Sequence, residues 1–150
     1  MSEVSSEYPK PWFVALLIFG GTVCIAVVFI LLDVLLNMDS FAGGTASSFL
    51  AAMGVGQYLA SKRPAPMPRR NRWLAASVYT LLTLALGAAL LALDAALHYQ
   101  VLGLARMSVN VLLIVAVVAA AVSVPLTYAG LLIGEKAAMK HAAKLAAKKG

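Results

Sequence analysis

The sequence has few charged residues. Asp, Glu, Lys and Arg make up 12% of its 150 residues, whereas soluble domains carry about 25%. Hydrophobic residues make up 62%, and the mean hydropathy is +0.90. This composition excludes a water-soluble globular domain and indicates a membrane protein.

Residues that carry catalysis or bind metals are also scarce. Cys24 is the one cysteine and there are two histidines, so an intramolecular disulfide is impossible and no zinc site is indicated. The sequence has no glycine-rich phosphate loop and no motif that places a nucleophile beside a base. We therefore expect no catalytic residues, no metal and no cofactor, and we predict that the protein is not an enzyme.

Long apolar runs are present instead. A bilayer core about 30 Å thick needs roughly 20 mostly apolar helical residues, and four runs fit this length, at about 12–36, 41–60, 73–97 and 109–134. The run at 41–60 is the least apolar, because glycine, serine and threonine interrupt it. We interpret 12–36 as a retained signal anchor, since it is longer than the apolar part of a cleaved signal peptide. The expected fold is one all-α membrane domain with four transmembrane helices and a helical tail at 135–150.

Basic residues are confined to one side of such a bundle. Every Lys and Arg except Arg106 falls in the N-terminal tail, in the connection 61–72 or in the C-terminal tail. Because basic segments resist translocation, both termini are predicted to be cytoplasmic. The net charge of +6 is therefore interpreted as a topology signal, and no nucleic-acid partner is expected.

Two basic segments on that side are candidates for contact with anionic lipid headgroups. Pro64, Pro66 and Pro68 make the connection stiff and extended, and lysines at four-residue intervals form one stripe along the tail. An acidic partner protein is the alternative occupant of the connection. The basic residues of the two segments are Lys62, Arg63, Arg69, Arg70, Arg72, Lys136, Lys140, Lys144 and Lys148.

The two halves of the chain share a spacing. The same interval separates Trp12 from Asp33 and Trp73 from Asp94. This match predicts two repeated helical hairpins related by an axis along the membrane normal.

A polar cluster is predicted at the opposite, outer end of the bundle. It consists of Asp33, Asp94, His98 and Arg106. In one interpretation Asp33 and Asp94 each anchor a helix end or pair with Arg106. In the other they bind a cation or relay a proton, because Asp94 and His98 are one helical turn apart.

Small residues recur every four positions in the second run. Gly44, Ser48, Ala52 and Gly56 fall on one side of a helix, and small residues let membrane helices approach closely. This face either packs within the bundle or meets a second copy or a larger partner. The third run has a similar series, Ala88, Ala92 and Ala96.

The passage from the second run into the connection, SFLAAMGVGQYLASKRPAP at 48–66, resembles an uncharacterised family of small four-helix bacterial membrane proteins. The resemblance implies a location in the bacterial inner membrane and supplies no catalytic residue. Small multidrug transporters also have four helices, but they carry an essential carboxylate in the first one. Here no acid lies between Trp12 and Leu32.

The leading functional prediction is a non-catalytic accessory or interaction subunit of an inner-membrane assembly, as a homo-oligomer or within a larger complex. It would use the small-residue face of the second run and the basic connection. A cation- or proton-coupled transporter built on Asp33, Asp94 and His98 is the second hypothesis. The third is a membrane protein that gives immunity to a toxin, which no particular residue supports.

Overall fold

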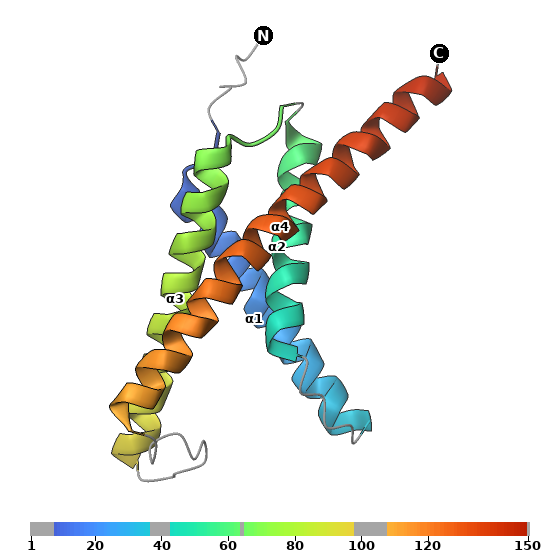
Figure 1. The fold of residues 1–150 in the computed structure, drawn as a ribbon. Coiled ribbons are helices and arrows are strands. Elements are labelled where there is room, and N and C mark those ends of the chain that lie inside the picture. The colour runs from blue at the N-terminus through green and yellow to red at the C-terminus, as the bar shows by residue number, and fades with distance from the viewer. Residues whose placement is uncertain (1–7, 37–42, 64, 98–107, 150) are drawn as a thin grey trace.

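The computed structural model describes residues 8–36, 43–63, 65–97 and 108–149 (Figure 1). This part of the chain is all-helical, with α1 at Pro11–Leu36, α2 at Gly43–Lys62, α3 at Arg69–Leu97 and α4 at Val109–Lys149. Pro11 occupies the first position of α1, where its missing N–H costs no hydrogen bond. Pro68 immediately precedes α3, and its carbonyl accepts hydrogen bonds from the N–H groups of Asn71 (3.0 Å) and Arg72 (3.2 Å).

Two helices are longer than the apolar runs that predicted them. Helix α3 begins at Arg69, so Arg69, Arg70 and Arg72 belong to its first turns and not to the connection. Helix α4 passes through Pro125 and continues to Lys149 without interruption. Its 41 residues correspond to about 62 Å, roughly twice the thickness of a bilayer core.

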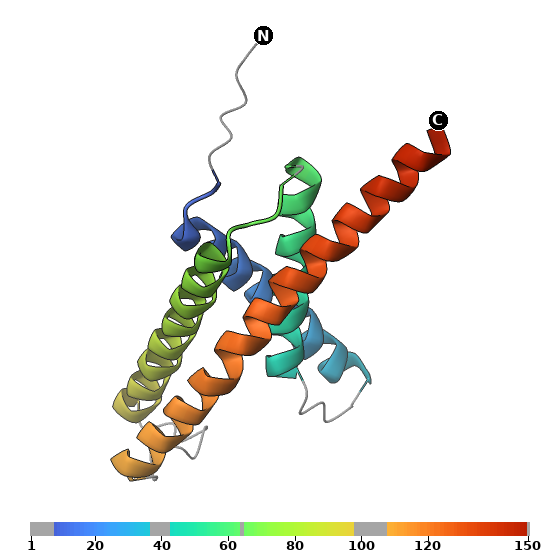
Figure 2. The same ribbon diagram turned by 45° about the horizontal axis from the view of Figure 1, so that its top comes forward.

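The helices form a ring in which α1 and α4 are each packed beside α2 and α3. The most extensive contact joins α2 to α4, which cross at a marked angle (Figures 1 and 2). A two-fold axis between repeated hairpins would place α1 diagonally opposite α3. Instead α1 lies next to α3, and α2 has 20 residues where α4 has 41. The described helices therefore lack the rotational symmetry that the Trp–Asp spacing predicts.

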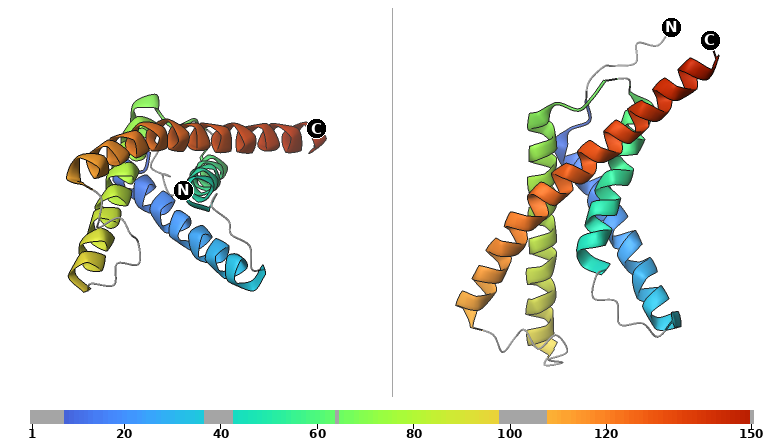
Figure 3. Two further views of the ribbon diagram at one scale, coloured as in Figure 1. Left: turned by 60° about the horizontal axis from the view of Figure 1, so that its bottom comes forward. Right: turned by 45° about the vertical axis from the view of Figure 1, so that its right-hand side comes forward.

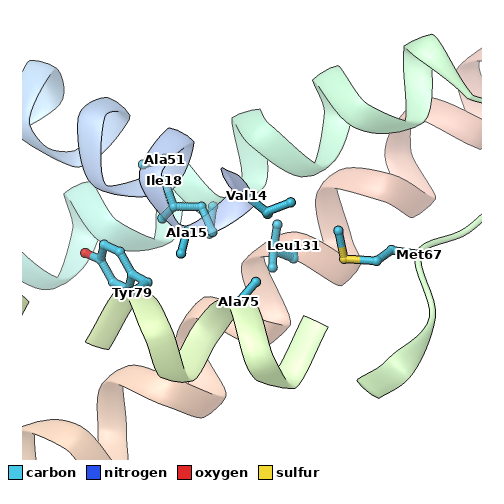
Figure 4. Packing of buried hydrophobic residues seen from close by; sticks show 9 residues of the cluster. Val14, Ala15, Ile18, Ala51, Met67, Ala75, Tyr79 and Leu131 are labelled. Atoms are coloured by element: carbon cyan, nitrogen blue, oxygen red, sulfur yellow. The ribbon is translucent and has the colours of Figure 1, made fainter. Parts of the chain in front are cut away.

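The hydrophobic core lies at one end of the bundle. It is built from Val14, Ala15 and Ile18 of α1, Ala51 and Ala52 of α2, Met67 of the connection, Ala75, Ala76 and Tyr79 of α3, and Leu131 of α4 (Figure 4). We call this the basic end, because Lys10, Lys62 and the start of α3 also lie there. The Tyr79 hydroxyl is 3.2 Å from Oγ1 of Thr22, which joins α3 to α1.

Away from the basic end the helices separate (Figure 3). No described side chain in 19–36, 81–97 or 109–126 is buried by the rest of the chain. We call these three stretches the far halves of α1, α3 and α4. They carry apolar residues such as Leu31, Leu90 and Val117, which are all at least half exposed.

Three helical stretches within the described residues are long and apolar enough to cross a membrane. They are Pro11–Leu32, Arg69–Leu93 and Val109–Lys148. Helix α2, the least apolar of the predicted spans, is not among them. The structure thus contains four helices, of which three have the length and composition of membrane spans.

Candidate functional site

Helices α2 and α4 cross with their backbones in direct contact. A Cβ atom added to Gly134 would lie 2.1 Å from the carbonyl oxygen of Met53, and one added to Gly56 would lie 2.5 Å from that of Leu131. At Gly130 it would lie 2.9 Å from Cβ of Ala52. Distances this short leave room only for hydrogen, so the crossing requires glycine at these positions.

This crossing covers the predicted small-residue face. Ser48 and Ala52 are buried, Gly56 is buried as well, and Ala52 and Gly56 meet α4 directly. Gly44 belongs to α2, but its surroundings lie outside the described part of the structure. Between Ala52 and Gly56 the face therefore packs within the chain, and a partner would have to bind elsewhere.

A buried ion pair lies beside the crossing. Oε2 of Glu135 is 2.5 Å from a terminal guanidinium nitrogen of Arg72, and the two side chains are 4% and 12% exposed. Oε1 of the same carboxylate accepts a hydrogen bond of 3.1 Å from the backbone N–H of Met67. One carboxylate on α4 therefore holds both the connection and the first turn of α3.

Tyr8 fixes the chain that precedes α1 to the same connection. Its hydroxyl donates to the carbonyl oxygens of Ala65 and Pro66, and the guanidinium of Arg63 lies 5.5 Å from the centre of its ring. Burial raises the pKa of Tyr8, and the charge of Glu135 raises it further, while Arg63 and Arg72 oppose this shift. The hydroxyl therefore stays protonated at neutral pH and acts as a donor.

The basic residues that were predicted to contact lipid or a partner fall into three groups in the structure. Arg72 differs from the prediction that it faces lipid or a partner, because its guanidinium is turned inward to Glu135. Lys62 and Arg63 lie at the C-terminal end of α2 beside a cleft. The others are exposed on α3 and α4, and they are Arg69, Arg70, Lys136, Lys140, Lys144 and Lys148.

The cleft opens where α2 and α4 diverge above their crossing. It has a volume of about 840 Å³ and lies between α2 from Gly54 to Lys62 and α4 from Ala137 to Leu145. Lys62, Arg63 and His141 are its basic residues, and Ala138 and Ala142 form part of its apolar wall. We refer to it as the α2–α4 cleft.

The predicted outer polar cluster stays a prediction, because the side chains of Asp33 and Asp94 lie outside the described part of the structure. Asp33 and Asp94 lie in the last turns of α1 and α3, and these two helix ends diverge (Figures 1 and 3). His98 and Arg106 lie outside the described residues. Within the described part, no three His, Cys, Asp or Glu residues are grouped so that they could hold a metal ion.

Sequence reasoning did not identify Glu135 or Tyr8 as important residues. Glu135 is the single acidic residue in the sequence of α4, and it follows Gly134, which the α2 backbone approaches most closely. The sequence signal for Glu135 was an isolated acidic residue that follows a glycine and precedes a series of lysines. Tyr8 had no comparable signal, because its contacts depend on a connection more than fifty residues away.

Comparisons with protein-family models, with curated proteins and with solved structures find no match to this chain. The resemblance of 48–66 to a bacterial family therefore stays a prediction.

Proposed function

We propose that this protein is a non-catalytic membrane subunit that associates with other transmembrane helices, in a homo-oligomer or a larger assembly of the bacterial inner membrane. The observation that carries the proposal is that no described side chain in the far halves of α1, α3 and α4 is buried, although these stretches contain many apolar residues. The buried core lies at the basic end, and the described side chains of the far halves are all at least partly exposed.

Exposed leucine alone does not imply a partner, because lipid solvates leucine as well as another helix does. Exposed small residues are more informative. Ala88, Ala92 and Ala96 are all exposed on α3, and small residues in a span favour close helix association over contact with lipid. A transmembrane helix packed on this alanine face would bury the three alanines that the chain itself leaves exposed.

The proposed orientation places the basic end in the cytoplasm, with α2 as a fourth, short span. It is supported by the position of Lys10, Lys62 and the lysine stripe at one end of the bundle, since basic segments stay on the cytoplasmic side.

The test compares two substitutions on α3. Ala92→Leu should separate the complex, because the larger side chain prevents close approach of a second helix. Leu90→Ala, on a different side of the same turn, should leave it intact. The mass of the wild-type protein and both variants would be measured by light scattering in a mild detergent.

The proposal fails if the wild type has the mass of a single chain in detergent and in nanodiscs. It also fails if Ala92→Leu leaves the mass of the complex unchanged. Far-UV circular dichroism of each variant checks that the helices are retained.

A further inference from the structure

We propose that the α2–α4 cleft is a binding site for an anionic phospholipid, which places its phosphate headgroup against Lys62 and Arg63. This inference goes beyond the proposed function, because it needs no partner protein. It requires only that the basic end of the bundle faces a lipid headgroup layer.

The shape of the cleft follows from the glycine crossing. Gly56 and Gly134 bring the two helices together at backbone distance, and the ends beyond them separate at a wide angle (Figures 1 and 2). The space between these ends measures about 840 Å³, which is within the range of about 300–1,000 Å³ found for small-molecule sites. Alanine side chains on α4 leave the cleft open, since Ala138 and Ala142 fill little of it.

The depth of the cleft matches the headgroup layer. Trp73 stacks on Tyr128 with ring centres 4.8 Å apart, and such aromatic residues prefer the membrane interface. Leu131, at the crossing, is less than one turn beyond Tyr128. Lys62 is six residues beyond Gly56, or about 9 Å along the helix, which brings its ammonium group into a headgroup layer roughly 5–8 Å thick.

The charges around the cleft favour an anion with an apolar part. Nζ of Lys62 lies 5.9 Å from the centre of the Tyr58 ring, which keeps the ammonium at the rim. None of the described residues that line the cleft is acidic, and Glu135, the acid of α4, is paired with Arg72 and is not among them. Lysine and arginine are the residues that bind phosphate, while Leu145 and the alanines suit the glycerol and acyl part of a lipid.

Lipid is favoured over an acidic peptide because of where the cleft lies. At the headgroup layer phospholipid is the most abundant anion, and its apolar part is continuous with the apolar wall of the cleft. An acidic amphipathic helix has similar chemistry, and it is therefore included as an outcome of the test.

The experiment titrates the purified full chain in detergent with phosphatidylglycerol and follows bound lipid by native mass spectrometry. Lys62→Gln should weaken binding about fivefold, as expected for one lysine near a phosphate, whereas Lys148→Gln, an equal loss of charge outside the cleft, should change it less than about twofold. Ala142→Phe fills the cleft without changing charge and should also weaken binding. Its control is Ala143→Phe, at an exposed position that does not line the cleft.

Four results would overturn the proposal. They are equal weakening by Lys62→Gln and Lys148→Gln, equal effects of the two phenylalanine variants, equally tight binding of zwitterionic phosphatidylcholine, and binding of a glutamate-rich amphipathic peptide where phosphatidylglycerol does not bind. Lys62→Gln changes an exposed side chain, so it tests the site even if Ala142→Phe fails to fold.

Discussion

Replacing Glu135 by glutamine removes the negative charge of the buried pair and keeps the size of the side chain. In the wild type this carboxylate is 4% exposed, with Oε2 2.5 Å from the Arg72 guanidinium. Glutamine can still accept the hydrogen bond from the Met67 N–H, but its amide cannot compensate the charge of Arg72. The variant therefore leaves a cation that is 12% exposed without its counter-charge.

The expected loss of unfolding free energy is about 3 kcal/mol. Removing one partner of a buried ion pair costs roughly 3–5 kcal/mol, and the lower value applies because Arg72 lies at the basic end and retains some exposure. Nε of Arg72 has no hydrogen-bond partner among the described residues, so little local compensation is available there. Replacing both residues together, as Glu135→Leu with Arg72→Met, should cost much less than either single change.

The assay is equilibrium unfolding in mixed micelles with increasing SDS, followed by far-UV circular dichroism and by tryptophan fluorescence. Fluorescence is informative because Trp73, which follows Arg72 in the chain, is stacked on Tyr128 of α4. Lys136→Gln is the matched control, since it removes one charge from the adjacent, exposed position. If Glu135→Gln unfolds within about 0.5 kcal/mol of the wild type, the reasoning on the buried pair is refuted.

Three further predictions use the same unfolding assay. Gly134→Ala should destabilise by about 1–3 kcal/mol because its Cβ would overlap the Met53 carbonyl, whereas Gly54→Ala, with nothing within 4 Å of its Cβ, should be neutral or stabilising; equal effects would contradict the backbone crossing. Tyr8→Phe should abolish an alkaline loss of stability. Because the folded pKa of Tyr8 is raised above its ordinary value of 10.0, the hydroxyl contributes fully below pH 10 and its contribution falls as pH rises through the folded pKa; an unchanged alkaline transition in the variant would contradict this. Thr127→Val should leave stability unchanged or slightly higher, because the buried Thr127 hydroxyl has no hydrogen-bond partner in the described part of the chain; a loss above about 1 kcal/mol would show that it has one.

The sequence by itself determined the membrane class, the all-helical architecture and the position of the long apolar helices. These properties depend on composition and on local runs of residues, because every backbone polar group in lipid must be satisfied within its own helix. The concentration of Lys and Arg in three segments also predicted that those segments share one end of the bundle, and the structure places the described parts of all three there.

The tertiary structure alone decided which helix faces and which charged side chains make contacts within the chain. Small residues in α2 indicated that some helix approaches closely, but the partner surface at Gly130 and Gly134 lies more than seventy residues later in the chain. Arg72 resembled its basic neighbours in sequence, yet it faces Glu135 because α3 begins four residues earlier than the apolar pattern implies. These contacts depend on where and at what angle two helices cross. The crossing is set jointly by segments that are far apart in the sequence, so no single run of residues predicts it.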